Sequence, residues 1–245
     1  MNAASRSRLI VALDVPRLDQ ALELVARLRG LDVVYKIGYE ALFGYGEALR
    51  RHLEDEGVDV FIDGKLHDIP RTVVAAVRAL VRPGVRILTV HALGGHEMMA
   101  AAVEAADEAA AAQGIAPPGI FAVTILTSIA PEELNELGLQ GGPGENVMRL
   151  AALARDARCA GVVCSAHEVR DLKAYFASEF AALCGGIRPA GGAHGDQKRV
   201  ATPRLAVENG ADYLVVGRPI TGAPDPAQAA RAILDEMAEA AGVRA

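Results

Sequence analysis

Short apolar runs alternate along this chain with longer segments in which apolar residues recur at helical spacing. The first run, residues 9–13, ends at Asp14, and the segment after it carries Leu18, Leu22 and Val25 on one helical face. The same pattern then repeats to the end of the chain. Eight runs are predicted to be strands: 9–13, 33–35, 58–62, 85–90, 120–126, 161–164, 181–187 and 213–216.

The segments between these runs predict helices. They cover residues 18–28, 40–56, 71–81, 97–112, 131–137, 146–158 and 166–176, and a last helix runs from the Asp225-Pro226 pair to about residue 240. Continuous apolar strands separated by helices indicate a parallel sheet whose outer face is covered. Eight such units predict an α/β fold, a single (β/α)8 TIM-barrel domain over residues 1–245. A doubly wound sheet is less favoured, because no strand-turn-helix carries a Gly-x-Gly-x-x-Gly sequence.

Composition narrows the class of partner. The 245 residues are 51% hydrophobic and 23% charged, with a net charge of −6, only 4% aromatic residues and no run of Lys or Arg, which argues against a nucleic-acid surface. No apolar run approaches the roughly 20 residues that cross a bilayer, and run 9–13 is too short for a signal peptide. A cytoplasmic protein without a membrane partner is therefore expected. Cys159, Cys164 and Cys184 are expected to be buried reduced thiols.

Polar residues follow nearly every predicted strand. In barrels of this class the active site lies at the carboxyl ends of the strands. The residues at those ends should therefore converge on one mouth: Asp14, Lys36, Asp63, Lys65, Thr127, Ser128, Arg188 and Arg218.

The densest cluster of charge is Asp63-Gly64-Lys65-Leu66-His67-Asp68, directly after run 58–62. It places two carboxylates and an ammonium group within six residues, where opposite charges keep each other ionised and in position. A solvated surface ion pair is the plain alternative for such a cluster. The other strand-end residues favour a functional site instead.

Two glycine-rich segments flank the expected mouth, residues 189–199 and 217–221. Loops after the seventh and eighth strands are the usual phosphate site of these barrels. Gly217 would let a backbone amide approach an anion, and Arg218 would add charge-assisted donors. The glycines between residues 191 and 195 predict a mobile lid in the loop 189–197, with an ordinary surface loop as the alternative.

The segment from Asp63 to Thr72, DGKLHDIPRT, resembles the motif of the orotidine 5′-phosphate decarboxylase family. The resemblance covers the whole chain. The DGKLHDIPRT motif becomes highly specific when it is joined to the Gly-Asp-Gln and Gly-Arg-Pro-Ile segments. The further segments that carry it are LDV at 13–15, VYKIG at 34–38, VHA at 90–92, LTS at 126–128, VCS at 163–165, GIRP at 186–189, GDQKR at 195–199 and VGRPI at 216–220. The resemblance implies decarboxylation of orotidine 5′-monophosphate to UMP and CO₂ in pyrimidine biosynthesis, by a homodimer that uses no metal and no cofactor.

The resemblance also assigns roles to residues. It implies that Lys65 stabilises the carbanion and supplies the proton, while Asp63 and Asp68 keep Lys65 charged and oriented. Lys36 completes this tetrad, to which the neighbouring subunit contributes Asp68. The implied substrate contacts are Asp14 and Lys36 at the ribose hydroxyls, Asp63 near the substrate carboxylate, Thr127 and Ser128 near the base, Arg188, Gln197, Gly217 and Arg218 at the phosphate, and Ile69 and Thr72 within the motif. The mechanism needs no histidine, so His67, His91 and His194 are expected to be structural or solvent-facing.

Two rival functions use the same residues. An enzyme like 3-keto-6-phosphogulonate decarboxylase would hold Mg²⁺ with this charged core and would require a further acidic residue, for which the strand ends supply no obvious candidate. A non-catalytic barrel that binds a phosphorylated ligand would be expected to have lost Lys65 or one of its aspartates. All three of Asp63, Lys65 and Asp68 are present.

Overall fold

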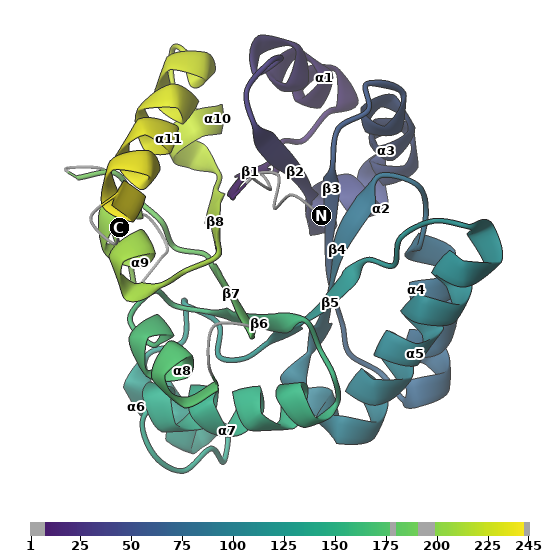
Figure 1. Ribbon diagram of the computed structural model, residues 1–245, viewed down its shortest axis with the longest axis vertical. Helices are drawn as coiled ribbons and strands as arrows, with labels where there is room; N and C mark the ends of the chain where they lie inside the picture. The colour runs from purple at the N-terminus through teal and green to yellow at the C-terminus, as the bar shows by residue number, and fades with distance from the viewer. Residues whose placement is uncertain (1–7, 177–179, 191–198, 243–245) are drawn as a thin grey trace.

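Eight parallel strands close into a barrel in sequence order, β1 to β8, in a computed structural model that describes residues 8–176, 180–190 and 199–242. The closed barrel confirms the predicted (β/α)8 fold (Figure 1). The strands are β1 Leu9–Ala12, β2 Val33–Ile37, β3 Val60–Leu66, β4 Val85–His91, β5 Gly119–Val123, β6 Gly161–Cys164, β7 Ala181–Cys184 and β8 Tyr213–Val216.

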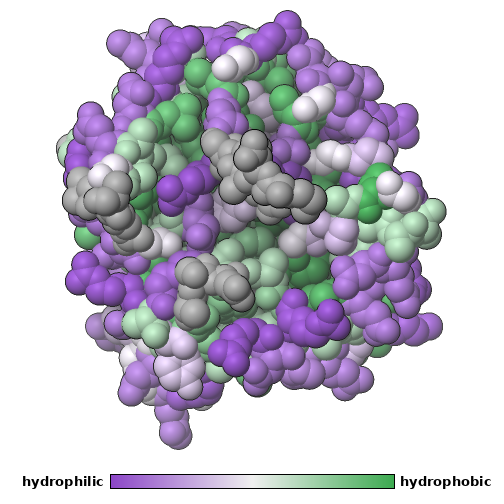
Figure 2. Space-filling view, in the orientation of Figure 1, coloured by the Kyte–Doolittle hydropathy of each residue, from purple (hydrophilic) through white to green (hydrophobic). Residues whose placement is uncertain are grey.

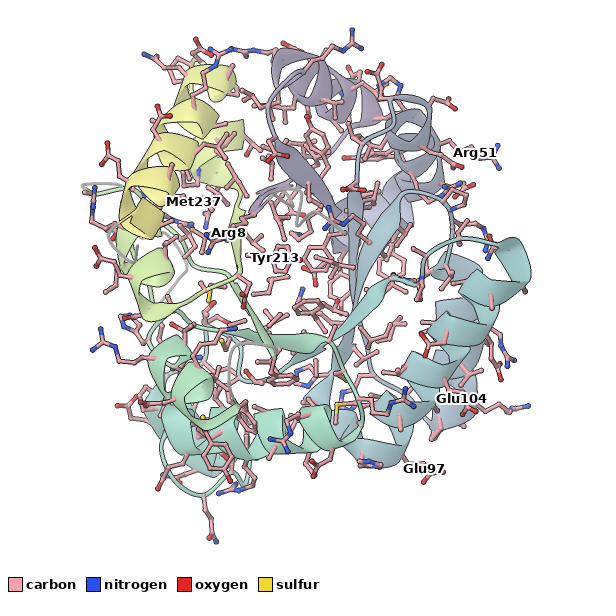
Figure 3. The ribbon with its side chains drawn as sticks, in the orientation of Figure 1. Arg8, Arg51, Glu97, Glu104, Tyr213 and Met237 are labelled. Carbon is pink, nitrogen blue, oxygen red and sulfur yellow. The ribbon has the colours of Figure 1, made fainter. Side chains whose placement is uncertain are left out.

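Helices surround the barrel on its outer side (Figure 1). They are α1 Leu18–Arg27, α2 Tyr39–Gly44, α3 Gly46–Asp55, α4 Pro70–Leu80, α5 Gly95–Gln113, α6 Pro131–Glu136, α7 Pro143–Asp156, α8 Val169–Phe176, α9 Pro203–Asn209, α10 Arg218–Thr221 and α11 Pro226–Gly242, with a 3-10 turn at Ala92–Gly94. Figure 3 shows Arg51, Glu97 and Glu104 pointing away from the barrel, whereas Tyr213 lies at its inner side. On the face drawn in Figure 2, hydrophilic residues occupy most of the periphery and hydrophobic residues lie mainly towards the middle.

The strands bury side chains on both faces, which is why their apolar runs are continuous rather than alternating. The inner core consists of Ile10, Val34, Phe61, Ile87, Phe121 and Leu183. A larger outer core packs the other face of the strands against the helices. The ring of Phe121 meets the edge of Tyr213, with 5.9 Å between ring centroids. This packing fills the barrel interior and leaves the carboxyl ends of the strands free to carry polar groups.

Several predicted elements have different bounds in the structure. The helix predicted over residues 40–56 is two helices, because Tyr45 leaves helical geometry at φ −150° and its hydroxyl donates to the carbonyl of Val15. The helices α9 and α10 were not predicted. Thr202 caps the N-terminus of the short α9, and its hydroxyl accepts from the amide of Leu205 at 3.1 Å.

Two other expectations are confirmed. The carboxylate of Asp225 accepts from the amide of Gln228 at 3.1 Å, so the last helix begins where the Asp-Pro pair predicted. Cys159, Cys164 and Cys184 are free and buried. Among the described residues no helix is long and apolar enough to cross a membrane.

Candidate active site

The third strand is irregular where it delivers its charged residues. Ile62 pairs with Leu88 and Leu66 pairs with Val90, so Asp63, Gly64 and Lys65 together face Thr89 alone. Such a bulge bends a strand and re-aims its side chains. At this bulge Lys65 has φ 40°, a left-handed conformation that non-glycine residues rarely adopt. The strand was predicted to end at residue 62, but it continues through the bulge to Leu66.

Four charged side chains form one network at the carboxyl end of the barrel, three of them on β2 and β3 and the fourth, Asp14, just after β1. Nζ of Lys65 lies 2.7 Å from Oδ2 of Asp63, and Nζ of Lys36 lies 3.4 Å from the same oxygen. Nζ of Lys36 also donates to both carboxylate oxygens of Asp14, at 3.0 and 3.2 Å. The charges therefore alternate in sign from Asp14 through Lys36 and Asp63 to Lys65.

Asp63 is the buried centre of this network. Burial disfavours its ionised form, but the ammonium groups of Lys36 and Lys65 and the hydrogen bonds from Lys65 and Thr89 outweigh that cost and hold the pKa of Asp63 below its usual value. Lys65 is less buried and its Nζ lies 5.4 Å from the ring centroid of Tyr39. Lys36 and Thr89 thus fix the carboxylate of Asp63, while Lys65 lines the cavity at the mouth.

Gly38 permits the close approach of Asp14 and Lys36. A Cβ atom at this position would lie 2.6 Å from Nζ of Lys36 and closer still to Oδ1 of Asp14. Gly217, in contrast, has room for a Cβ, which would lie 3.6 Å from Cβ of Ala12 in ordinary contact. A Cβ at position 38 would therefore displace the ends of the Asp14 and Lys36 side chains, whereas position 217 accommodates one without a shift.

A cavity of about 480 Å³ opens over the network. It confirms that the strand-end residues converge on one mouth, although their roles remain predictions. The predicted residues that line it are Asp14, Lys36, Asp63, Lys65, Thr127, Ser128, Arg188, Gly217 and Arg218. The rest of the lining is largely apolar and includes Phe61, Val123, Ile125 and Leu183. A floor of this kind suits an organic ring, with charged groups at both ends of the cavity.

Three predicted site residues do not line this cavity. Asp68, Ile69 and Thr72 are exposed, and the carboxylate of Asp68 accepts from the amide of Ile69 at 2.6 Å. Lys65 forms an ion pair with Asp63, whereas no ion pair joins Lys65 to Asp68 within the described part of this chain. Gln197, His194 and most of the predicted lid, residues 191–197, lie outside the described residues.

Thr89 is a buried residue at the network that the sequence analysis missed. Its hydroxyl donates to Oδ1 of Asp63 at 3.0 Å and accepts from the backbone amide of Lys65 at 2.9 Å. The available signal was a polar residue inside the largely apolar run of β4, which also contains Arg86.

Two histidines lie beside the same turn. The rings of His67 and His91 stack with 5.2 Å between centroids, and the amide of Leu93 donates to Nδ1 of His91 at 3.3 Å. Burial, followed by the nearby His67 and Lys65, lowers the pKa of His91 to about 4. His91 is therefore neutral at physiological pH and holds a turn together, in agreement with the structural role expected for it.

A buried ion pair outside the network joins two loops at this end of the barrel. Arg199 pairs with Glu168 and also donates to the carbonyl of Ile125 at 3.1 Å, next to the lining residues that follow β5. Within the described ranges, no group of three or more His, Cys, Asp or Glu side chains could hold a metal ion.

Comparison with known proteins identifies the family of this chain. Residues 7–233 match the model of the Orotidine 5′-phosphate decarboxylase / HUMPS family. Orotidine 5′-phosphate decarboxylase of Moorella thermoacetica is 48% identical over 95% of this chain and 93% of its own length, and that of Nitrosococcus oceani is 46% identical over 95% and 98%. Among solved structures, orotidine 5′-phosphate decarboxylase of Lactobacillus acidophilus superposes with a TM-score of 0.83 at 37% identity, covering 94% of this chain and 99% of the other.

Proposed function

Because this chain belongs to the Orotidine 5′-phosphate decarboxylase / HUMPS family, and so is a decarboxylase of pyrimidine biosynthesis, we propose that Lys65 is the residue that acts on the reacting carbon of orotidine 5′-monophosphate. One observation carries the proposal. The ammonium group of Lys65 lines the cavity and is held 2.7 Å from the carboxylate of the buried Asp63. A cation held in this way can stabilise negative charge that develops directly above it.

The reaction places specific demands on that cation. When the bond between the pyrimidine ring and its carboxylate breaks, CO₂ departs and the electron pair remains on the ring carbon. A fixed ammonium group stabilises that pair and then transfers a proton to the same carbon, which gives UMP. Lys36 and Asp63 keep Lys65 oriented through the shared carboxylate oxygen, and solvent returns the proton to Lys65 afterwards. No metal or cofactor takes part in this scheme.

The remaining lining residues suit the rest of the nucleotide. Asp14 and Lys36 are held together at 3.0 Å and present an acceptor and a donor for the ribose hydroxyls. Thr127 and Ser128 provide hydroxyl groups near the base. Arg188, Gly217 and Arg218 lie after β7 and β8, where barrels of this class bind phosphate.

The proposal includes a cytoplasmic homodimer in which Asp68 acts in the partner's site. Asp68, Ile69 and Thr72 are exposed outside the cavity of their own chain. Large apolar side chains are exposed on the neighbouring segments after β2, β3 and β4: Tyr39 is 49% exposed, Phe43 82%, Ile69 61% and Leu93 47%. Apolar surface beside charged residues is typical of an interface between subunits.

Incubation with orotidine 5′-monophosphate in the presence of EDTA, followed by ultraviolet absorbance, tests the function directly. Full turnover that EDTA does not change is the expected result. Turnover that EDTA abolishes and Mg²⁺ restores would favour a metal-dependent enzyme like 3-keto-6-phosphogulonate decarboxylase. Binding of the nucleotide without any turnover would favour a binding protein and contradict the proposal.

A further inference from the structure

Thr89 occupies the one position on β4 that faces the bulge of β3. Three residues of β3, from Asp63 to Lys65, oppose this single residue, so the regular pairing of backbone groups is interrupted there. The side chain of Thr89 makes the connection instead, since its hydroxyl accepts from the amide of Lys65 at 2.9 Å and donates to Asp63 at 3.0 Å. Thr89 is 1% exposed and does not line the cavity.

We propose that Thr89 is a positioning residue for the decarboxylation, which fixes the backbone of Lys65 and the carboxylate of Asp63 relative to each other through one hydroxyl group. The inference rests on the proposed function, because it assumes that Lys65 acts on the substrate. In this inference Thr89 touches neither the substrate nor the cavity and acts only through Lys65 and Asp63.

The geometry explains why a hydroxyl is needed at this point. The left-handed conformation of Lys65 is strained for a residue with a side chain, and it persists only where neighbouring groups hold it. Its amide would lose the acceptor shown here if the hydroxyl of Thr89 were absent, since the bulge interrupts the regular backbone pairing. Oδ1 of Asp63 would lose its donor at the same time. Both ends of the Asp63–Lys65 ion pair would then be free to shift.

Thr89→Val tests the inference, because it replaces the hydroxyl with a methyl group and keeps the shape of the side chain. We expect kcat for orotidine 5′-monophosphate to fall about 10- to 100-fold, as expected for losing a hydrogen bond to a charged group. KM should change little, because Thr89 does not touch the cavity. Thr89→Ser keeps the hydroxyl and is expected to recover most of kcat.

Thr124→Val is the matched control. Thr124 is also 1% exposed, and its hydroxyl donates to the carbonyl of Val163 at 2.7 Å, away from Asp63 and Lys65. This variant loses a buried hydroxyl in the same way, so it reports the effect of lower stability alone. We expect its thermal midpoint to fall about as far as that of Thr89→Val while its kcat stays near that of the wild type.

The outcomes separate this inference from the proposed function. A wild-type protein that fails to decarboxylate the substrate would overturn the proposed function and the inference with it. An active wild type with an unchanged kcat in folded Thr89→Val would overturn the inference alone. Equal losses of kcat in Thr89→Val and Thr89→Ser, or in Thr89→Val and Thr124→Val, would likewise show that packing or stability matters rather than the hydroxyl.

Discussion

Asp63 and Lys65 are two residues apart on one strand, yet their side chains form an ion pair of 2.7 Å between Oδ2 and Nζ. Side chains at this spacing leave a regular strand on the same face about 6.5 Å apart. The bulge of β3 and the φ of 40° at Lys65 alter that arrangement. They bring the ammonium group of Lys65 into contact with the buried carboxylate of Asp63. Asp63 also attracts Lys36, at 3.4 Å, so one carboxylate orients two ammonium groups.

Lys65→Ala should fold and lose nearly all turnover. The side chain lies at the mouth outside both cores, and Lys36 still neutralises the buried Asp63 after the change. Removing both the charge and the proton donor should lower kcat by at least about 10⁴-fold. Thermal melting and steady-state kinetics measure the two effects, with Arg51→Ala on an exposed face of α3 as the control. Substantial decarboxylation by folded Lys65→Ala would contradict the role given to Lys65.

Asp68 should act across the subunit interface. An inactive Lys65→Ala chain and an inactive Asp68→Asn chain are mixed, and the heterodimer is isolated. If Asp68 acts in the partner's site, one of the two sites has both wild-type residues, and about half of the wild-type activity should return. If Asp68 acts in its own chain, neither site is complete and the heterodimer stays inactive. An inactive heterodimer would therefore disprove the exchange of Asp68.

Arg218 should contribute to catalysis although it is far from the reacting bond. It lines the cavity at the start of α10, and a charge-assisted contact that the bound phosphate desolvates is worth about 2–5 kcal/mol. Binding energy from a remote part of the substrate can be used in the transition state. Arg218→Ala should therefore lower kcat/KM for the nucleotide strongly and leave the slow reaction of the phosphate-free nucleoside almost unchanged. Equal losses on both substrates would mean that Arg218 supports the fold or the base pocket.

Gly38→Ala should disturb the ribose end of the site. Its new methyl group would collide with Asp14 and Lys36 and force that pair apart. We expect KM to rise and kcat to fall, by about tenfold or more in kcat/KM, because Lys36 also orients Asp63. Gly44→Ala is the matched control, since a Cβ at that position meets nothing within 4 Å and φ is not positive. Kinetics of Gly38→Ala that equal those of Gly44→Ala would show that the pair can move aside at no cost.

His91 should make the fold less stable in acid. Its pKa is lowered from 6.5 to about 4 in the folded chain, so the unfolded chain binds more protons between these values. Stability is then greatest above pH 6.5 and falls as the pH drops towards 4. Allowing for solvent around this partly exposed ring, the loss should be about 1–2 kcal/mol.

Urea unfolding at pH 7.5 and pH 4.5 measures this effect in the wild type and in His91→Asn. Asparagine offers an oxygen that can accept from the amide of Leu93, but it does not titrate. The wild type should lose more stability than the variant between the two pH values. The same loss in both proteins would assign the acid sensitivity to other groups.

The sequence by itself determined the fold and most of the candidate site. Eight continuous apolar runs separated by helical segments are consistent with few architectures, and a parallel barrel brings all strand ends to one mouth. The positions of Asp14, Lys36, Asp63 and Lys65 directly after those runs were therefore enough to predict that they meet. Their proximity follows from local pattern and topology, both of which are properties of the sequence.

Only the tertiary structure decided how these residues are held. The bulge of β3 depends on its pairing with β4, a contact between residues more than twenty positions apart, and no local pattern encodes that register. In the sequence Thr89 is a polar residue in a buried strand, and only the pairing of β3 with β4 places its hydroxyl between Lys65 and Asp63. Asp68 belonged to the same motif as Lys65, but the end of β3 carries it to the exposed surface. Adjacency in sequence sets which residues are available near a site, whereas backbone geometry and pairing across strands set which of them meet.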